Sequence, residues 1–372
     1  MSEQNVHPSL EQLLDLARPH ETAVTIYAST SPEDRDKSKL VVKAAFDEAI
    51  RELRVGGVSR STEEELRRRW AQYEDSLLWG KLSSSIVLLL ADDVDELFVL
   101  PNRFEDRVQV GTYFDLSQLV RAATTPQEAF GLTLSQNGWN LWHGTATRRA
   151  EEMVLAGEHP TDVADATNRA TVRDRGYVGR LVGDEGRTVL LETYASRVAE
   201  SVVSELPAGN GSAPLFVFAT SPLLELYLSA DRTGRTLVVS EGSPDALGAH
   251  DVDAAMRAGL PTVNADVIND RLDRLGDGIA HGTVARDLAD IAKAASLGAV
   301  ETLIYDVTSD VTGEVDLVTG ALSYSDDGYH VLSRLALQVL DTGGQVFAVR
   351  PEEIRSATWI APAVAGLRFA LA

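Results

Sequence analysis

Hydrophobic and polar positions in the first third of the chain switch between strand-like and helical spacing. Residues 22–30 alternate apolar and polar side chains, as a half-buried strand does. Two later segments repeat apolar residues at helical spacing, and we expect Ser38 and Thr62 to cap them. The predicted elements are a strand at 22–30, helices at 38–54 and 62–79, a hairpin of 84–93 and 95–101, and a closing segment at 108–123.

The middle of the chain begins with the clearest turn signal in the sequence. Two alternating runs within residues 130–144 flank Asn137-Gly138, a pair that tolerates the backbone of a tight hairpin. A long polar stretch, 157–187, follows without a clear periodic pattern. Beyond it the pattern predicts helix 188–206, strand 215–220, a short helix and strand 235–242. Strands interleaved with helices indicate an α/β domain.

The last third of the chain repeats one arrangement twice, a helix followed by a glycine turn and an apolar strand. It occurs first at 284–306, where Gly298 is the expected helix C-cap, and again at 329–351. A final strand is expected at 364–371. The pattern predicts a small α/β/α sandwich. We expect three consecutive α/β domains, at 1–125, 126–262 and 263–372.

Composition narrows the class of protein. The chain has 372 residues, 44% of them hydrophobic, which is ordinary for a globular protein. It has no cysteine, and we find neither a signal-peptide pattern nor an apolar run long enough to span a bilayer. We therefore expect a cytoplasmic protein with no membrane partner.

The net charge of −22 bears on possible partners. A chain this acidic is repelled by nucleic acid on average, so we expect no DNA partner. Any RNA partner must meet a local basic patch or be approached through another protein. The alternative is that the acidity only aids solubility.

Three phrases of the last third resemble a known domain in its own order. "AASLGAVETLIYD" (294–306), "LDTGGQVFAVRPEE" (340–353) and "VAGLRFAL" (364–371) resemble the C-terminal domain of archaeal and eukaryotic class-one release factors and Pelota. The earlier phrases "VTIYAST" (24–30) and "GLTLSQNGWNLWHGTATRRAEEM" (131–153) are similar to the bacterial branch, the archaeo-eukaryotic release-factor-like proteins. The resemblance implies three α/β domains, the last of them L7Ae-like, and a role at the ribosome with rRNA or tRNA as partner. By analogy with Pelota it also implies a translational GTPase partner.

The triplet Gly343-Gly344-Gln345 has the composition of the release-factor catalytic tip. In that family, however, the catalytic triplet lies in the middle domain, after its first hairpin and before a long helix. The corresponding stretch here, 157–187, contains no Gly-Gly-Gln. Gly343 and Gly344 follow an apolar helical pattern and precede an apolar strand, where a positive-φ residue is wanted. We interpret the triplet as a structural turn and assign no catalytic residue.

The 157–187 stretch holds the best RNA-contact candidates, because arginines beside an aromatic ring can bind phosphates and stack a base. The candidates are Arg169, Arg173, Arg175, Tyr177, Arg180 and Arg187. The alternative is an ordinary solvated loop, since Asp174, Asp184 and Glu185 dilute the patch. Its glycines also leave open a divergent hydrolase that acts on peptidyl-tRNA through this loop.

Other candidate sites are weaker. The "RRRW" cluster at 67–70 follows three glutamates at helical spacing, which is typical of a solvated helix face. The Asn-Ile-Lys-Ser sequence by which the family reads stop codons is missing. The histidines lack metal-ligand spacing, and there is no phosphate-binding loop, so we expect no metal and no cofactor.

The leading hypothesis is therefore a ribosome-associated, RNA-binding translation factor in rescue, stalling response or hibernation, without cleavage of peptidyl-tRNA. The second is the divergent hydrolase. The third is a protein-interaction scaffold in a stress response, away from the ribosome, which the charge of −22 favours.

Overall fold

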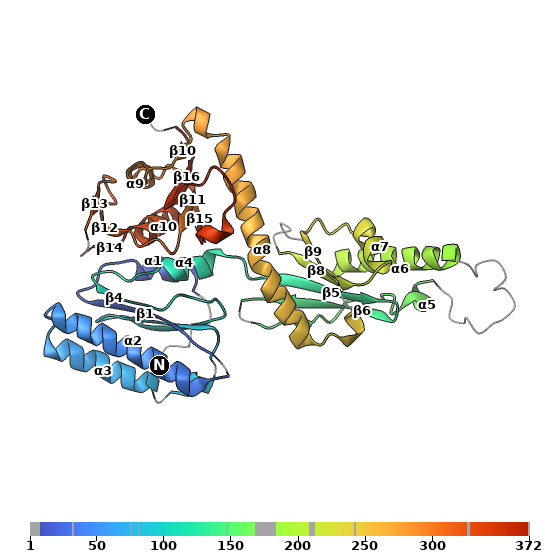
Figure 1. Cartoon of the computed structure of the whole chain (residues 1–372), viewed down its shortest axis with the longest axis horizontal. Coiled ribbons are helices and arrows are strands. Elements are labelled where there is room, and N and C mark those ends of the chain that lie inside the picture. The colour runs from blue at the N-terminus through green and yellow to red at the C-terminus, as the bar shows by residue number, and fades with distance from the viewer. Residues whose placement is uncertain are drawn as a thin grey trace. The chain divides into compact units, whose positions relative to one another are not determined.

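The chain forms two compact units, Met1–Thr125 with Ala265–Ala372, and Pro126–Asn264 (Figure 1). The computed structural model describes residues 8–31, 33–74, 76–80, 82–146, 148–167, 184–207, 213–241, 243–325 and 328–370. Both units combine helices with sheets, which confirms the predicted α/β class. The division into three domains stays a prediction. In the structure the N-terminal and C-terminal segments share one hydrophobic core.

An antiparallel sheet in the order β3-β2-β1-β4 organises the N-terminal segment. Alternate residues of β1 reach two different cores: Ile26 packs with the long helices on one face, and Tyr27 packs with the short helices on the other. The strands are β1 (Ala23–Ser29), β2 (Ser85–Leu90), β3 (Asp95–Leu100) and β4 (Arg107–Gly111). The helices are α2 (Arg35–Val55) and α3 (Arg60–Glu74) on the first face, α1 (Leu10–Leu16) and α4 (Ser117–Thr124) on the second, and the short η1 (Leu77–Gly80).

The two predicted helix caps are wrong by a few residues. Asp34 caps α2 by accepting from the backbone N–H of Lys37 at 3.1 Å, while Ser38 is buried and donates to the Asp34 carbonyl. Ser59 caps α3 by accepting from the backbone N–H of Thr62 at 3.2 Å. Each helix starts earlier than predicted because an upstream Asp or Ser reaches the free N–H groups first.

The C-terminal segment is an α/β/α sandwich around a sheet in the order β10-β16-β11-β15. On β11, Leu303 and Tyr305 face the core of α9 and α10, whereas Ile304 packs with Leu272 of α8 on the opposite face. The strands are β10 (Val284–Ala285), β11 (Val300–Asp306), β15 (Gln345–Val349) and β16 (Ala363–Leu367). The helices are α8 (Ala249–Gly276), η4 (Ile279–His281), α9 (Leu288–Ser296), α10 (Val331–Asp341) and η5 (Pro351–Glu353). A small second sheet contains β12 (Thr312–Val315), β13 (Leu322–Tyr324) and β14 (Tyr329–His330).

Helix α4 joins the two segments of the first unit into one core. The Tyr27 hydroxyl donates to the carbonyl of Asp115 at 2.7 Å, and the Tyr305 hydroxyl donates to the carbonyl of Ser117 at 3.1 Å. Arg121 extends from α4 to β15 and donates to the Ala348 carbonyl at 2.8 Å. Because buried polar groups need partners, these bonds fix how the two segments pack.

The second unit is built on a five-stranded sheet in the order β7-β6-β5-β8-β9. The predicted hairpin is present, with Ser135 opposite Gly138, and β8 and β9 run parallel to β5. Helices α6 and α7 pack on one face and the first half of α8 packs on the other. The strands are β5 (Ala129–Ser135), β6 (Gly138–Gly144), β7 (Glu151–Glu152), β8 (Leu215–Ala219) and β9 (Leu237–Glu241). The helices are α5 (Val163–Ala166), α6 (Asp184–Glu205), α7 (Leu223–Ala230) and η3 (Pro244–Ala246).

Candidate functional site

The β5–β6 turn gathers the elements that flank the arginine-rich stretch of the second unit. The backbone N–H of Val163, at the start of α5, donates to the carbonyl of Gln136 in the turn at 3.4 Å. From the other side Arg187, in α6, donates from Nη2 to Oε1 of the same Gln136, also at 3.4 Å. The turn, α5 and the start of α6 therefore form one end of this unit, which we call the hairpin end.

The chain leading to α5 is held by polar contacts. The indole N–H of Trp139 donates to the carbonyl of Pro160 at 2.6 Å. His159 pairs with Glu205 of α6 at 2.7 Å, and both side chains are largely buried. Two further bonds to the Glu205 carboxylate, from the backbone N–H of Ala156, lower the pKa of that carboxyl together with His159. The charged carboxylate thus ties residues 156–160 to α6.

Of the six predicted RNA-contact residues, only Arg187 lies within the described part of the chain. Its side chain is exposed at the hairpin end. Arg169, Arg173, Arg175, Tyr177 and Arg180 lie outside the described residues. The predicted role of the group as an RNA contact stays a prediction.

A buried tyrosine at the hairpin end was not among the sequence candidates. Tyr194 of α6 is 0% exposed, and its hydroxyl has no hydrogen-bond partner among the described residues. Burial, together with the nearby carboxylates of Asp162 and Asp245, raises the pKa of Tyr194 above its usual value. The phenol therefore stays protonated and could donate a hydrogen bond but cannot act as a base. In the sequence this residue reads only as part of the apolar face of a helix.

The Gly343-Gly344-Gln345 triplet lies in the first unit, at the exit of α10. Gly343 has φ 74°, and the backbone N–H of Gly344 donates to the carbonyl of Val339 at 2.8 Å. This is the left-handed helix ending that the sequence predicts, in which glycine avoids steric strain. Gln345 begins β15, and its side-chain oxygen accepts from Arg271.

The "RRRW" cluster is engaged by the fold. Arg67 pairs with Glu63 at 2.8 Å, and Arg68 pairs with Glu65. Arg69 donates to the carbonyls of Ala91 and Val94, so it fixes α3 to the β2–β3 turn. These contacts leave little free positive charge on α3 for RNA.

The described residues offer neither a metal site nor a membrane-spanning helix. No cluster of three or more His, Cys, Asp or Glu side chains in this part of the chain is arranged to hold a metal ion. No helix within it combines the length and the apolar character that a membrane crossing requires.

The fold defines an α/β protein whose second unit brings the β5–β6 turn, α5 and Arg187 at the start of α6 together at one end. Residues 126–266 match the model of bacterial archaeo-eukaryotic release factor family 11, which confirms the predicted release-factor-like resemblance. The match covers the second unit and the start of the remaining chain. No curated protein matches the chain.

Several solved structures align with most of the chain at low identity. Pelota of Archaeoglobus fulgidus is 14% identical over 98% of this chain and 93% of its own, with a TM-score of 0.37. The archaeal termination factor aRF1 is 14% identical over 99% and 100%, with a TM-score of 0.24. Dom34 of S. cerevisiae, described as interacting with Hbs1, is 10% identical over 77% and 79%, with a TM-score of 0.33.

Proposed function

We propose that the protein is a ribosome-associated translation factor that acts in ribosome rescue, in the response to stalling or in hibernation. The observation that carries the proposal is the match of residues 126–266 to a release-factor family. That segment contains no Gly-Gly-Gln, and the triplet elsewhere in the chain forms a helix ending. We therefore propose binding at the ribosome without cleavage of peptidyl-tRNA by such a tip.

The charge of one sequence segment supports an RNA contact. Residues 168–187 contain five arginines and three acidic residues, although the whole chain carries −22. If all five arginines bind phosphates, counterion release predicts that the logarithm of the affinity falls with the logarithm of salt with a slope of about −3.5. A contact made mainly through protein surfaces depends on salt much less.

The test is co-sedimentation of the protein with 70S ribosomes across a salt series. We expect Arg173→Gln with Arg175→Gln to weaken binding and to reduce the slope by about 1.4. Arg197→Gln is the matched control, because Arg197 is an exposed arginine of α6 outside the segment. The proposal would be contradicted if the protein did not sediment with ribosomes at low salt. It would also be contradicted if the double variant and Arg197→Gln lost ribosome binding equally.

The same preparation separates the two alternatives. Release of labelled peptide from stalled ribosomes, lost on substitution within 157–187, would favour the divergent hydrolase. The charge of −22 favours the non-ribosomal scaffold, which predicts no ribosome binding in any state.

We further propose a translational GTPase as partner, because the sequence phrases of the last third resemble Pelota-like factors, which use such a partner. The proposal predicts that a GTP-bound translational GTPase raises the fraction of protein that sediments with ribosomes. An unchanged fraction would contradict it.

A further inference from the structure

Strand β4 is an open edge of the first sheet. In the order β3-β2-β1-β4, it pairs with β1, and no other strand of the described chain pairs with it. All five of its residues are partly accessible. An open edge offers backbone donors and acceptors that can bind another extended chain.

The orientation of neighbouring bonds shows which residues of β4 face outward. The N–H of Thr30 points to β2, where it donates to Ser84, and the N–H of Ser29 points to the β4 side, where it donates to Asp106. In an antiparallel strand these directions alternate, so Thr25 bonds to its partner Gln109. The backbone groups of the neighbouring Val108 and Val110 therefore point away from the sheet.

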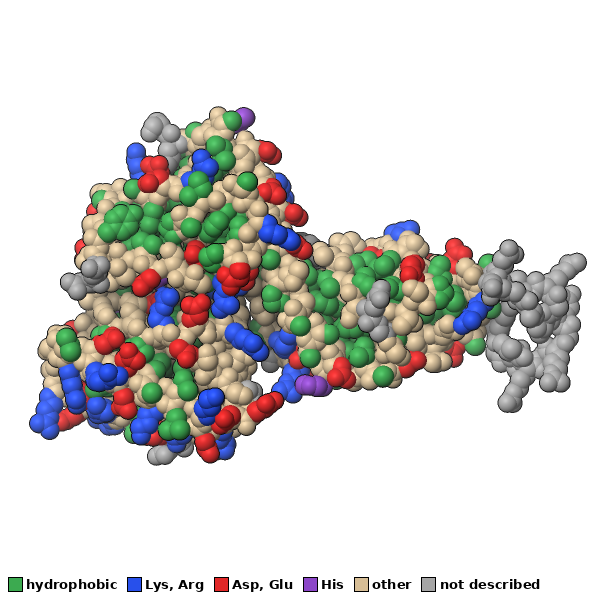
Figure 2. Space-filling model, viewed as in Figure 1, with side chains coloured by type: hydrophobic (Ala, Val, Ile, Leu, Met, Phe, Trp, Pro, Cys, Tyr) green, Lys and Arg blue, Asp and Glu red, His purple; other side chains and the backbone are tan. Residues whose placement is uncertain are grey.

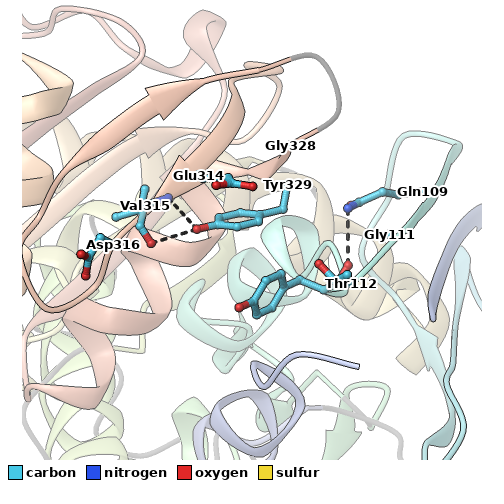
Figure 3. Close-up of a pocket in the computed structure, with 9 residues that line it drawn as sticks. Gln109, Gly111, Thr112, Glu314, Val315, Asp316, Gly328 and Tyr329 are labelled. Carbon is cyan, nitrogen blue, oxygen red and sulfur yellow. Dashed lines mark hydrogen bonds between the residues drawn. The ribbon is translucent and has the colours of Figure 1, made fainter. Parts of the chain in front are cut away.

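A cavity of about 360 Å³ lies along this edge, on the face of Gln109 and Gly111. Figure 3 shows Glu314 of β12 and Asp316, which follows this strand, on the side of the cavity opposite Gln109, with Glu314 near the ring of Tyr329. Glu314 is exposed and forms no ion pair within the described chain. A side chain that enters the cavity from a chain bound at β4 would meet carboxylates.

Two aromatic rings line the cavity, and an arginine side chain packs against them. The rings of Tyr113 and Tyr329 are 4.8 Å apart, and the guanidinium of Arg334 lies 4.2 Å from the Tyr113 ring. Arg334 also donates to the carbonyl of Ala17, so it is held within the fold. It therefore does not neutralise Glu314 on the open side of the cavity.

The opposite face of the same edge is apolar. Val108 and Val110, like Val41 and Ala45 of α2, pack at the margin of a core cluster. An added strand would place alternate residues on this margin and in the cavity, because strand side chains alternate between faces. A strand that fits both faces would therefore carry alternating apolar and basic residues.

We propose that β4 is a docking edge for an extended basic segment of a partner protein, which adds as a strand. Its apolar side chains extend the Val108–Val110 margin, and its Arg or Lys side chains enter the cavity beside Glu314 and Asp316. This inference goes beyond the proposed function and does not depend on it, because it concerns a protein partner of the first unit.

The test uses a short fluorescein-labelled peptide of alternating valine and arginine with the full-length protein. We expect saturable binding and slowed hydrogen exchange in residues 107–111. The same peptide with N-methyl groups on alternate amides keeps its charge but cannot pair with a strand edge, and we expect no binding. A valine–glutamate peptide is the charge control, and we expect no binding from it either.

Protein variants then test the two faces. Glu314→Gln should weaken binding about tenfold, the effect of losing about 1.4 kcal/mol. Glu352→Gln, at an exposed glutamate of the same unit outside the cavity, should have no effect. Val110→Pro removes an outward backbone N–H, so peptide binding should be lost. Proline is tolerated in edge strands, and the melting temperature of the variant shows whether the sheet is intact.

Equal binding of the N-methylated and parent peptides would overturn the proposal, because charge alone would then explain the affinity. Protection of β3 or β9 in place of β4 would also overturn it, as would failure of the valine–arginine peptide to bind.

Discussion

Replacing Gly344 by alanine tests whether the Gly-Gly-Gln triplet is structural. A Cβ at this position would lie 2.5 Å from Cγ1 of Val339 and 2.8 Å from the carbonyl oxygen of Val300. Val339 is fully buried and β-branched, so it cannot turn aside, and the second neighbour is backbone. Overpacking of this kind costs about 3 kcal/mol.

The expected shift in melting temperature follows from that cost. At about 2–4 °C per kcal/mol for a unit of this size, Gly344→Ala should melt roughly 6–12 °C below the wild type. Gly343→Ala meets no neighbour closer than 4.0 Å but must adopt φ 74°. That conformation costs an alanine about 1–2 kcal/mol, so we expect a smaller decrease of roughly 2–8 °C.

Gln345→Ala is the control for function, because it removes the third residue of the triplet and leaves the turn. Gln345 is exposed, and the change loses only the contact with Arg271, so the melting temperature should fall by about 2 °C or less. Calorimetry of the four proteins and ribosome co-sedimentation complete the assay. A Gly344→Ala protein that melts like the wild type, or a Gln345→Ala protein that folds but no longer acts on ribosomes, would refute the reasoning.

Two further predictions concern buried polar groups. Tyr194→Phe removes a buried hydroxyl without a partner in the described chain, so thermal unfolding should show equal or slightly higher stability. Tyr305→Phe loses a buried hydrogen bond and should lower the free energy of unfolding by about 1 kcal/mol. A large loss of stability for Tyr194→Phe would show that the hydroxyl is bonded. For Asp115, burial favours a higher pKa, but His330 and Arg107 outweigh it and hold the pKa below its usual value. The stability that this carboxylate adds is present above about pH 3.9 and is lost as the pH falls through the lower pKa of the folded state. The melting-temperature difference between wild type and Asp115→Asn should therefore be constant near neutral pH and shrink below about pH 4. A difference that shrinks between pH 5 and 7 would contradict this assignment.

The elements that local pattern controls were the ones the sequence predicted well. The Asn137-Gly138 hairpin is present, because its turn residues and the flanking alternation agree. The helix ending at Gly298 has the positive φ that the sequence predicts. The helix starts were less accurate, since Asp34 and Ser38 are both acceptable caps and the choice between them depends on the packing of the turn before α2.

Contacts between residues far apart in the chain could not be predicted in this way. The shared core of the first unit depends on hydrogen bonds such as that from Tyr305 to Ser117, and neither residue marks the other in the sequence. The environment of Tyr194 could not be predicted either, because the carboxylates near its hydroxyl come from α5 and η3, which are distant in the sequence. The open edge at β4 follows from the order of strands, which alternation alone leaves undetermined.

Charge reconciles the proposed RNA contact with a chain of net charge −22. Electrostatic binding depends on the charges within about one Debye length, roughly 8 Å at physiological salt, and not on the total. A local excess of arginine at 168–187 can therefore attract phosphates, while Glu314 and Asp316 favour a basic segment at a different unit. The two proposals consequently predict different effects when charged side chains are replaced. Replacing arginines in 168–187 should affect only RNA, and replacing Glu314 should affect only the peptide.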